Sequence, residues 1–146
     1  MDSIHEILER YGLLLNKLLS SNAYSFSLVS PEQVPREPGV YVILTATTDS
    51  IIYVGRSKNL RRRLLSDHRL GNIEGSQFRK ALQRKFGLES EAKVSEYIRT
   101  NCSFKFITIR DPSEMVRFEH FTTAAVGPAL NIELAQQEDP ADSETQ

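Results

Sequence analysis

Hydrophobic residues near the start of the chain recur every three or four positions, which predicts an amphipathic helix over about residues 3–20. Ser3 and Glu6 form a capping-box pattern where this helix would begin. We expect the N-terminal segment, residues 1–22, to pack on the rest of the domain or to form a dimer seam. Residues 20–39 are polar and contain three prolines, so they are expected to form a loop.

Three later segments are rich in β-branched and aromatic residues, which favour strands. They span residues 39–46, 51–55 and 103–110. A short polar turn separates the first two, so these strands are expected to pair as a hairpin that brings Tyr41 close to Tyr53. The predicted fold class is α+β, with a small central, mainly antiparallel three-stranded sheet flanked by helices.

Four helices are expected after the hairpin, over residues 58–70, 77–86, 89–100 and 114–126. Ser76 and Gly87 are suited to begin and end the second of these, and Ser113 to cap the last, which Pro128 would stop. Residues 133–146 form an acidic tail that is expected to be disordered. The body of the chain, residues 38–132, is expected to be one domain.

The composition suits a small domain: the chain has 146 residues, 40% of them hydrophobic. No apolar run approaches the ~20 residues that span a bilayer, so we expect a soluble cytoplasmic protein with no membrane partner. Cys102 is the single cysteine, which excludes an internal disulfide and a cysteine-based metal cluster.

The net charge of −1 conceals an uneven distribution. Five of the 19 acidic residues lie from Glu133 onward, so residues 1–132 carry 18 basic against 14 acidic side chains. Residues 56–85 hold ten basic and two acidic residues. Such a patch suits a polyanion such as nucleic acid, although a charge run can also be a solvated helix face.

Two tripeptides face each other across the predicted hairpin, Gly-Val-Tyr at residues 39–41 and Tyr-Val-Gly at residues 53–55. They are followed by Arg63, eight residues after Gly55, and then by Glu119, with Pro128 and Asn131 nine and twelve residues beyond it. Together they resemble the GIY-YIG nuclease superfamily, with Val in place of Ile in both motifs. The resemblance covers about residues 38–132 and implies a small stand-alone nuclease domain.

This resemblance implies a metal-dependent endonuclease that hydrolyses phosphodiester bonds in DNA. A single carboxylate can hold hydrated Mg²⁺ or Mn²⁺, and Glu119 is the expected metal ligand. Arg63 is expected to clamp the scissile phosphate through its fork of donors. Tyr41 and Tyr53 are implied to position or activate water, although a tyrosine is a poor base unless nearby cations lower its pKa. Asn131 is expected to brace the site.

The candidate catalytic residues are Tyr41, Tyr53, Arg56, Arg63, His68, Glu119 and Asn131. Arg56 could bind phosphate or bias a tyrosine toward ionisation. Relatives often carry a histidine four residues beyond the arginine, but here that position is Asp67 and His68 is one residue later. Five residues along an α-helix turn by about 140° from the same face, so either the helix loosens near Ser66 or His68 points elsewhere.

The residues expected to contact nucleic acid are Arg56, Lys58, Arg61, Arg62, Arg63, Arg79 and Lys80. The basic side chains of residues 76–86 could track the backbone or simply be solvated, whereas Phe78, Leu82 and Phe86 are expected to pack inward. Single-stranded, duplex and branched DNA are all open as substrates, with RNA as an alternative. Family members act in DNA repair, restriction and homing.

Two other function classes compete with the nuclease. One is a catalytically silent nucleic-acid-binding module on the same fold, which would typically have lost the arginine or the glutamate. The other is an interaction protein whose basic face binds an acidic partner. Strongly salt-dependent DNA binding would count against the second.

Overall fold

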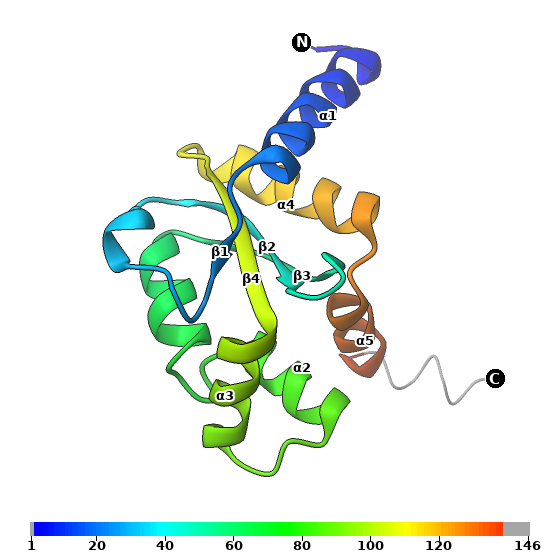
Figure 1. The fold of residues 1–146 in the computed structure, drawn as a ribbon. Helices are drawn as coiled ribbons and strands as arrows, with labels where there is room; N and C mark the ends of the chain where they lie inside the picture. The colour runs from blue at the N-terminus through cyan, green and yellow to red at the C-terminus, as the bar shows by residue number, and fades with distance from the viewer. Residues whose placement is uncertain (1, 139–146) are drawn as a thin grey trace, which may run out of the picture.

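The computed structural model describes residues 2–138 and shows an α+β fold, in which helices cover a curved sheet (Figure 1). The described strands are β1 (Tyr24–Ser25), β2 (Gly39–Thr45), β3 (Ile51–Ser57) and β4 (Cys102–Thr108). They lie in the order β1-β4-β2-β3, and each neighbouring pair is antiparallel. The predicted fold class is confirmed, and the hairpin of β2 and β3 forms as expected.

The sheet has four strands rather than the predicted three. The additional strand, β1, lies in the segment predicted as a loop and pairs along the edge of β4. The Tyr24 ring packs on Phe104 and Phe106, with centroid distances of 5.8 Å to each. A strand of two residues leaves no periodic pattern in the sequence, because its position is set by the strand it joins.

The described helices are α1 (Ile4–Ser20), the 3₁₀ turn η1 (Pro31–Gln33), the π-helix η2 (Arg62–His68), α2 (Gln77–Phe86), α3 (Glu91–Asn101), α4 (Pro112–Val126) and α5 (Ala129–Glu138). Their starts and ends mostly follow local capping residues. Ser76 accepts a hydrogen bond from the Arg79 N–H at the start of α2, and Gly87 ends α2 with a φ of 60°. These two predictions are confirmed.

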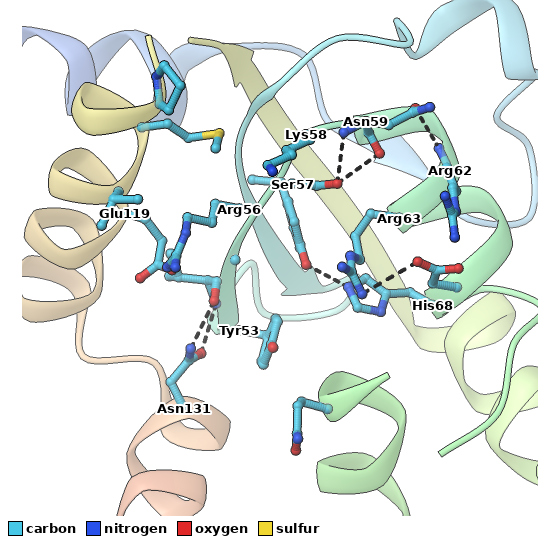
Figure 2. A pocket seen from close by; sticks show the side chains of 18 residues that line it. Tyr53, Arg56, Ser57, Lys58, Asn59, Arg62, Arg63, His68, Glu119 and Asn131 are labelled. Atoms are coloured by element: carbon cyan, nitrogen blue, oxygen red, sulfur yellow. Dashed lines mark hydrogen bonds and ion pairs between the residues drawn. The ribbon is translucent and has the colours of Figure 1, made fainter. Parts of the chain in front are cut away.

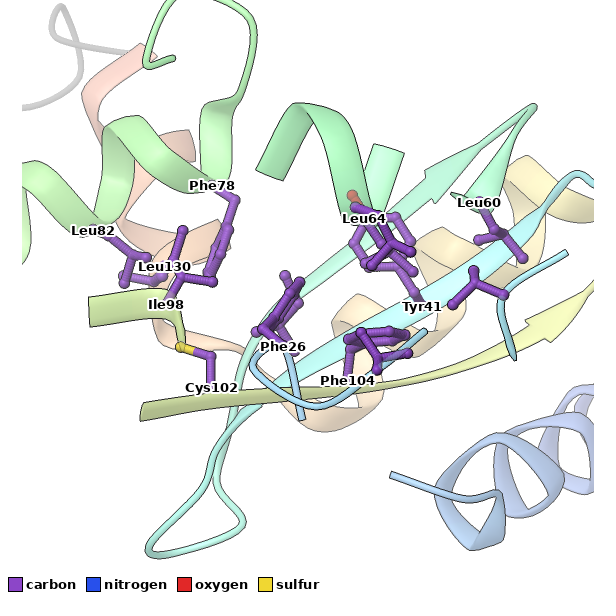
Figure 3. Packing of buried hydrophobic residues seen from close by; sticks show 14 of the residues in the cluster. Phe26, Tyr41, Leu60, Leu64, Phe78, Leu82, Ile98, Cys102, Phe104 and Leu130 are labelled. Carbon is purple, nitrogen blue, oxygen red and sulfur yellow. The ribbon is translucent and has the colours of Figure 1, made fainter. Parts of the chain in front are cut away.

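Strand β2 lies in the middle of the sheet and is buried on both faces. Tyr41 and Ile43 face a core that also contains Phe104 and Leu82, beneath η2 and α2 (Figure 3). Val40 belongs to a second core on the opposite face, where α1 and α4 pack. Burial on both faces explains why β2 reads as a continuous apolar run.

Helix α4 begins two residues earlier than predicted. Its N-cap is Asp111, whose carboxylate accepts the Glu114 N–H, and Pro112 occupies the first turn. The predicted cap, Ser113, lies inside the helix. Gly127, with a φ of 58°, ends the helix directly before Pro128.

The predicted acidic tail does not begin where expected, because residues 133–138 continue helix α5. Leu130 is buried and Leu134 packs against the core below β3, so this helix has an apolar side. The remaining tail residues, 139–146, lie outside the described part of the chain.

Phe86, predicted to pack inward, is instead 45% exposed at the end of α2 and stacks on Tyr97.

Helix α1 covers the sheet with one face and leaves another exposed. Tyr11 and Leu18 are buried against α4 and β4, whereas Ile4, Leu8 and Leu13 are exposed. One face of this helix therefore packs on the domain, and the other faces solvent. None of the helices within residues 2–138 is long and apolar enough to span a membrane.

Replacing either of two glycines by alanine is expected to change the stability of the fold, in opposite directions. A Cβ at Gly39 would collide with the Ile107 carbonyl oxygen of β4 and approach the Leu60 side chain to 2.7 Å, whereas a Cβ at Gly12 of α1 would meet nothing within 4 Å. We expect Gly39→Ala to lower the free energy of unfolding by about 1–3 kcal/mol. We expect Gly12→Ala to raise it by roughly 0.5–1 kcal/mol, because glycine is unfavourable inside a helix. Urea unfolding of both variants measures this, and a stable Gly39→Ala variant would contradict the packing described.

Candidate active site

A cavity of about 710 Å³ opens between the β3 end of the sheet, η2 and α4. Figure 2 shows Arg56 and Glu119 on one side of it and Arg63 and His68 on the other. All seven candidate catalytic residues line this cavity: Tyr41, Tyr53, Arg56, Arg63, His68, Glu119 and Asn131. Residues that are up to 90 positions apart in the sequence are thus brought to one place.

The two motif tyrosines lie side by side, with ring centroids 6.4 Å apart. Tyr41 pairs with Gly55 across the hairpin, and its hydroxyl lies where a Cβ of residue 55 would be. The second motif therefore needs its glycine to leave room for the tyrosine of the first. This close approach explains the combination of the two motifs in physical terms.

Both tyrosines are uncharged at neutral pH. Burial raises the pKa of Tyr41 well above its usual range, and burial followed by the Glu119 charge raises the pKa of Tyr53 to about 12. The Arg63 charge acts in the opposite direction on both pKa values but is outweighed. The cationic field that was expected to favour ionisation is present, yet desolvation dominates it.

His68 reaches the site because η2 is a π-helix. The Arg69 N–H donates to the Leu64 carbonyl five residues earlier, at 3.2 Å, which widens the turn. A wider turn brings Arg63 and His68, five residues apart, toward the same face. The structure therefore selects the first of the two sequence-based alternatives, a loosened helix near Ser66.

The His68 ring is 2% exposed and bonded at both nitrogens. Its Nε2 lies 2.6 Å from the Tyr41 hydroxyl oxygen, and its Nδ1 lies 2.7 Å from the Ser76 hydroxyl oxygen. Burial, with smaller contributions from Arg63 and Arg79, lowers the pKa of His68 to about 3. The imidazole is therefore neutral at physiological pH.

Glu119 projects from α4 and forms an ion pair with Arg56, whose Nη1 lies 2.6 Å from Oε2. The carboxylate is only 17% exposed, so a cation beside it offsets much of the cost of its burial. Arg56 thus contacts the carboxylate rather than a tyrosine. Arg63 faces Asp67 more loosely, with 3.4 Å between the nearest charged atoms.

Asn131 of α5 joins the site to strand β3 by two hydrogen bonds. Its amide nitrogen donates to the Val54 carbonyl and its amide oxygen accepts the Val54 N–H, both at 2.8 Å. Because β3 is at the edge of the sheet, these groups have no strand partner on that side. The contact fits the bracing role expected of this residue.

The predicted nucleic-acid-binding residues separate into two groups. Arg56, Lys58, Arg62 and Arg63 line the cavity, whereas Arg61, Arg79 and Lys80 do not. Arg61 donates through Nε to the Val34 carbonyl at 2.7 Å. For Lys80, contact with nucleic acid outside the cavity stays a prediction.

The prediction that Arg79 contacts nucleic acid is wrong, because its side chain is fully buried. It donates to the carbonyl oxygens of His68, Arg69 and Glu91, and also to the Glu91 carboxylate. The guanidinium therefore ties the end of η2 to the start of α3. Position within a run of charges does not reveal such a role, because the carbonyl groups that it satisfies come from distant turns.

Ser76 was predicted only as a helix cap, and its contact with His68 was missed. The two residues are eight positions apart and separated by a loop, so no periodic pattern links them. Met115 and Val116 of α4 form an apolar part of the cavity wall, which was not predicted either. No group of three or more His, Cys, Asp or Glu side chains that could hold a metal ion occurs in the described residues.

The comparisons with known proteins agree on one family. The family model of the GIY-YIG catalytic domain matches residues 30–144. A UvrABC system protein C from Synechococcus sp. (strain JA-2-3B'a(2-13)) is 29% identical over 103 residues, which cover 70% of this chain. The match spans only 14% of the length of that relative.

Among solved structures, the chain is similar to the GIY-YIG N-terminal endonuclease domain of UvrC from Thermotoga maritima bound to magnesium. The identity is 19%, with 80% of this chain and 94% of that chain covered and a TM-score of 0.42. A point mutant of the same domain, bound to its catalytic divalent cation, is 22% identical. The match covers 72% of this chain and 88% of that chain, with a TM-score of 0.41.

The neutral state of His68 predicts a pH dependence of stability. Its pKa is about 3 in the folded protein and about 6.5 in an unfolded chain, so the unfolded state binds more protons between these values. Stability should therefore fall as the pH drops below 6.5, by roughly 2 kcal/mol between pH 6.5 and pH 5 from this residue. We expect His68→Gln to lose this part of the dependence and the exposed control His120→Gln to keep it. Denaturant unfolding at each pH measures both, and equal pH slopes in wild type and His68→Gln would contradict the buried neutral ring.

Proposed function

The chain belongs to the GIY-YIG catalytic domain family, and from this membership we propose that it is an endonuclease that hydrolyses phosphodiester bonds in DNA. The observation that carries the proposal is that one cavity gathers Arg63, Glu119 and both motif tyrosines. The relatives named UvrABC system protein C favour DNA as the substrate and DNA repair as the setting. The chain matches only 14% of the length of these relatives, so the preferred DNA structure is itself part of the proposal.

The residues present fit a single divalent cation, Mg²⁺ or Mn²⁺, held at Glu119. Of the two carboxylates that line the cavity, Glu119 is the less exposed, and a bound cation would take over from Arg56 as its charge partner. Magnesium is suited to a site with one or two carboxylates, because it retains several waters and also binds substrate phosphate. When bound, the cation would stabilise the negative charge that develops on the phosphate and on the leaving oxygen.

The basic side chains supply the remaining charge for substrate. Arg63 projects into the cavity opposite Glu119 and can donate to two oxygens of the scissile phosphate (Figure 2). Lys58 and Arg62 are exposed at the rim, where neighbouring phosphates of the strand would pass. The neutral hydroxyls of Tyr41 and Tyr53 offer hydrogen bonds from the floor of the cavity to water or phosphate oxygen.

Glu119→Gln tests the metal site. We expect DNA cleavage to fall at least about a hundredfold while the fold is kept, because the amide has the same shape but no charge. Cleavage of labelled single-stranded, duplex and branched DNA would be measured with Mg²⁺, Mn²⁺ or EDTA, and Mn²⁺ binding by electron paramagnetic resonance. Glu96→Gln, an exposed acid of α3 outside the cavity, is the matched control. If the wild type binds DNA but cuts no substrate, the silent binding module replaces the nuclease.

The rim cations predict how binding depends on salt. We expect Lys58→Ala and Arg62→Ala each to weaken DNA binding at every sequence and to reduce the salt slope of the binding constant by roughly one. Lys93→Ala removes an exposed cation of α3 outside the cavity and should change neither quantity. Fluorescence anisotropy over a series of salt concentrations provides the slopes. Equal slopes for Lys58→Ala and Lys93→Ala would show that DNA does not cross this rim.

A further inference from the structure

A buried chain of hydrogen bonds runs from the start of α2 to the floor of the cavity. The Arg79 N–H donates to the Ser76 hydroxyl oxygen at 3.1 Å, and this oxygen lies 2.7 Å from His68 Nδ1. His68 Nε2 in turn lies 2.6 Å from the Tyr41 hydroxyl oxygen. Ser76 and His68 are 1% and 2% exposed, so water does not supply alternative partners between them, whereas Tyr41, although 2% exposed, lines the cavity.

Three hydrogens are available for the two bonds of the His68 ring, so either direction leaves one hydroxyl hydrogen without a protein partner. The direction is decided by whether that hydrogen lies at the cavity, as for Tyr41, or away from it, as for Ser76. Ser76 already accepts a hydrogen bond from a backbone N–H, and its own hydroxyl hydrogen still needs an acceptor. Among the described residues, His68 Nδ1 is the atom placed to accept it. A neutral imidazole that accepts at Nδ1 carries its hydrogen on Nε2, which therefore donates to the Tyr41 oxygen.

The opposite direction leaves a buried polar hydrogen without a partner. If Tyr41 donated to Nε2, then Nδ1–H would donate to Ser76, and the Ser76 hydroxyl hydrogen would have no acceptor among its described contacts. Native structures rarely leave such groups unpaired. The first direction pairs every hydrogen of Ser76 and His68, and it leaves the Tyr41 hydroxyl hydrogen free to point into the cavity.

We propose that Ser76 is a positioning residue that fixes the tautomer of His68, so that Tyr41 presents its hydroxyl hydrogen to an oxygen of the bound phosphodiester. The functional part of this inference rests on the proposed nuclease. Tyr41 then acts as a hydrogen-bond donor to developing negative charge, and no proton leaves it. Its raised pKa agrees with this role, because a donor must keep its hydrogen.

The tautomer can be observed without any cleavage assay. In the full chain labelled with ¹⁵N at histidine, nuclear magnetic resonance should show the His68 hydrogen on Nε2 in the wild type. Ser76→Ala should move the ring toward the Nδ1–H form or a mixture, and Ser76→Thr should keep the wild-type form. A wild-type His68 with its hydrogen on Nδ1 would overturn the proposal, and this result needs no variant to fold.

Ser90 provides a matched control, because it caps α3 with the same geometry, accepting the Lys93 N–H at 3.2 Å, and does not contact His68. Ser90→Ala should leave the His68 signals unchanged. In cleavage of DNA with Mg²⁺, we expect Ser76→Ala to lower kcat at least about tenfold with little change in KM. Ser76→Thr should restore most of the rate, and Ser90→Ala should cleave like wild type.

The two readouts separate the inference from the proposed function. A wild type that cuts no DNA but shows the Nε2–H form would overturn the nuclease and support the positioning of His68 by Ser76. A wild type that cuts DNA while Ser76→Ala leaves both the tautomer and kcat unchanged would overturn the positioning role and keep the nuclease.

Discussion

The hydrogen bond between the Tyr41 hydroxyl and His68 joins the central strand of the sheet to the helical layer that packs on it. Both groups are buried, so breaking the bond would leave two polar atoms without a partner inside the core. The bond requires a residue without a side chain at position 55, because the Tyr41 ring lies against the backbone there. It also requires a helical turn wide enough to place His68 at the site. The glycine of the second motif and the π-helix are therefore both needed for this one contact.

Charged and neutral groups occupy different depths of the site. The ion pair of Arg56 and Glu119 is partly open to solvent, as is the pair of Arg63 and Asp67. Beneath them the tyrosines and His68 are neutral, because burial raises the pKa of Tyr53 to about 12 and lowers that of His68 to about 3. Charged side chains at the rim can move to meet an incoming phosphate, whereas the neutral groups below are held by packing.

Much of the fold could be predicted from the sequence, because the main strands and most helices are marked by local apolar runs and capping residues. The candidate catalytic residues were predicted from the resemblance to the GIY-YIG family, and they line one cavity. What could not be predicted depends on distant partners. Strand β1 exists only along β4, and Asp111 and Ser113 are equally good caps by type. Arg79 resembles a surface cation until the carbonyl groups around it are known.

The π-helix has a consequence for how such a domain can change during evolution. One additional residue within a helix normally rotates everything beyond it by about 100°, which would remove a histidine from its site. Here Arg63 and His68, five residues apart, both line the cavity because the turn between them is wide. A helix that widens in this way can therefore gain or lose one residue while the side chains that line a site keep their positions in space.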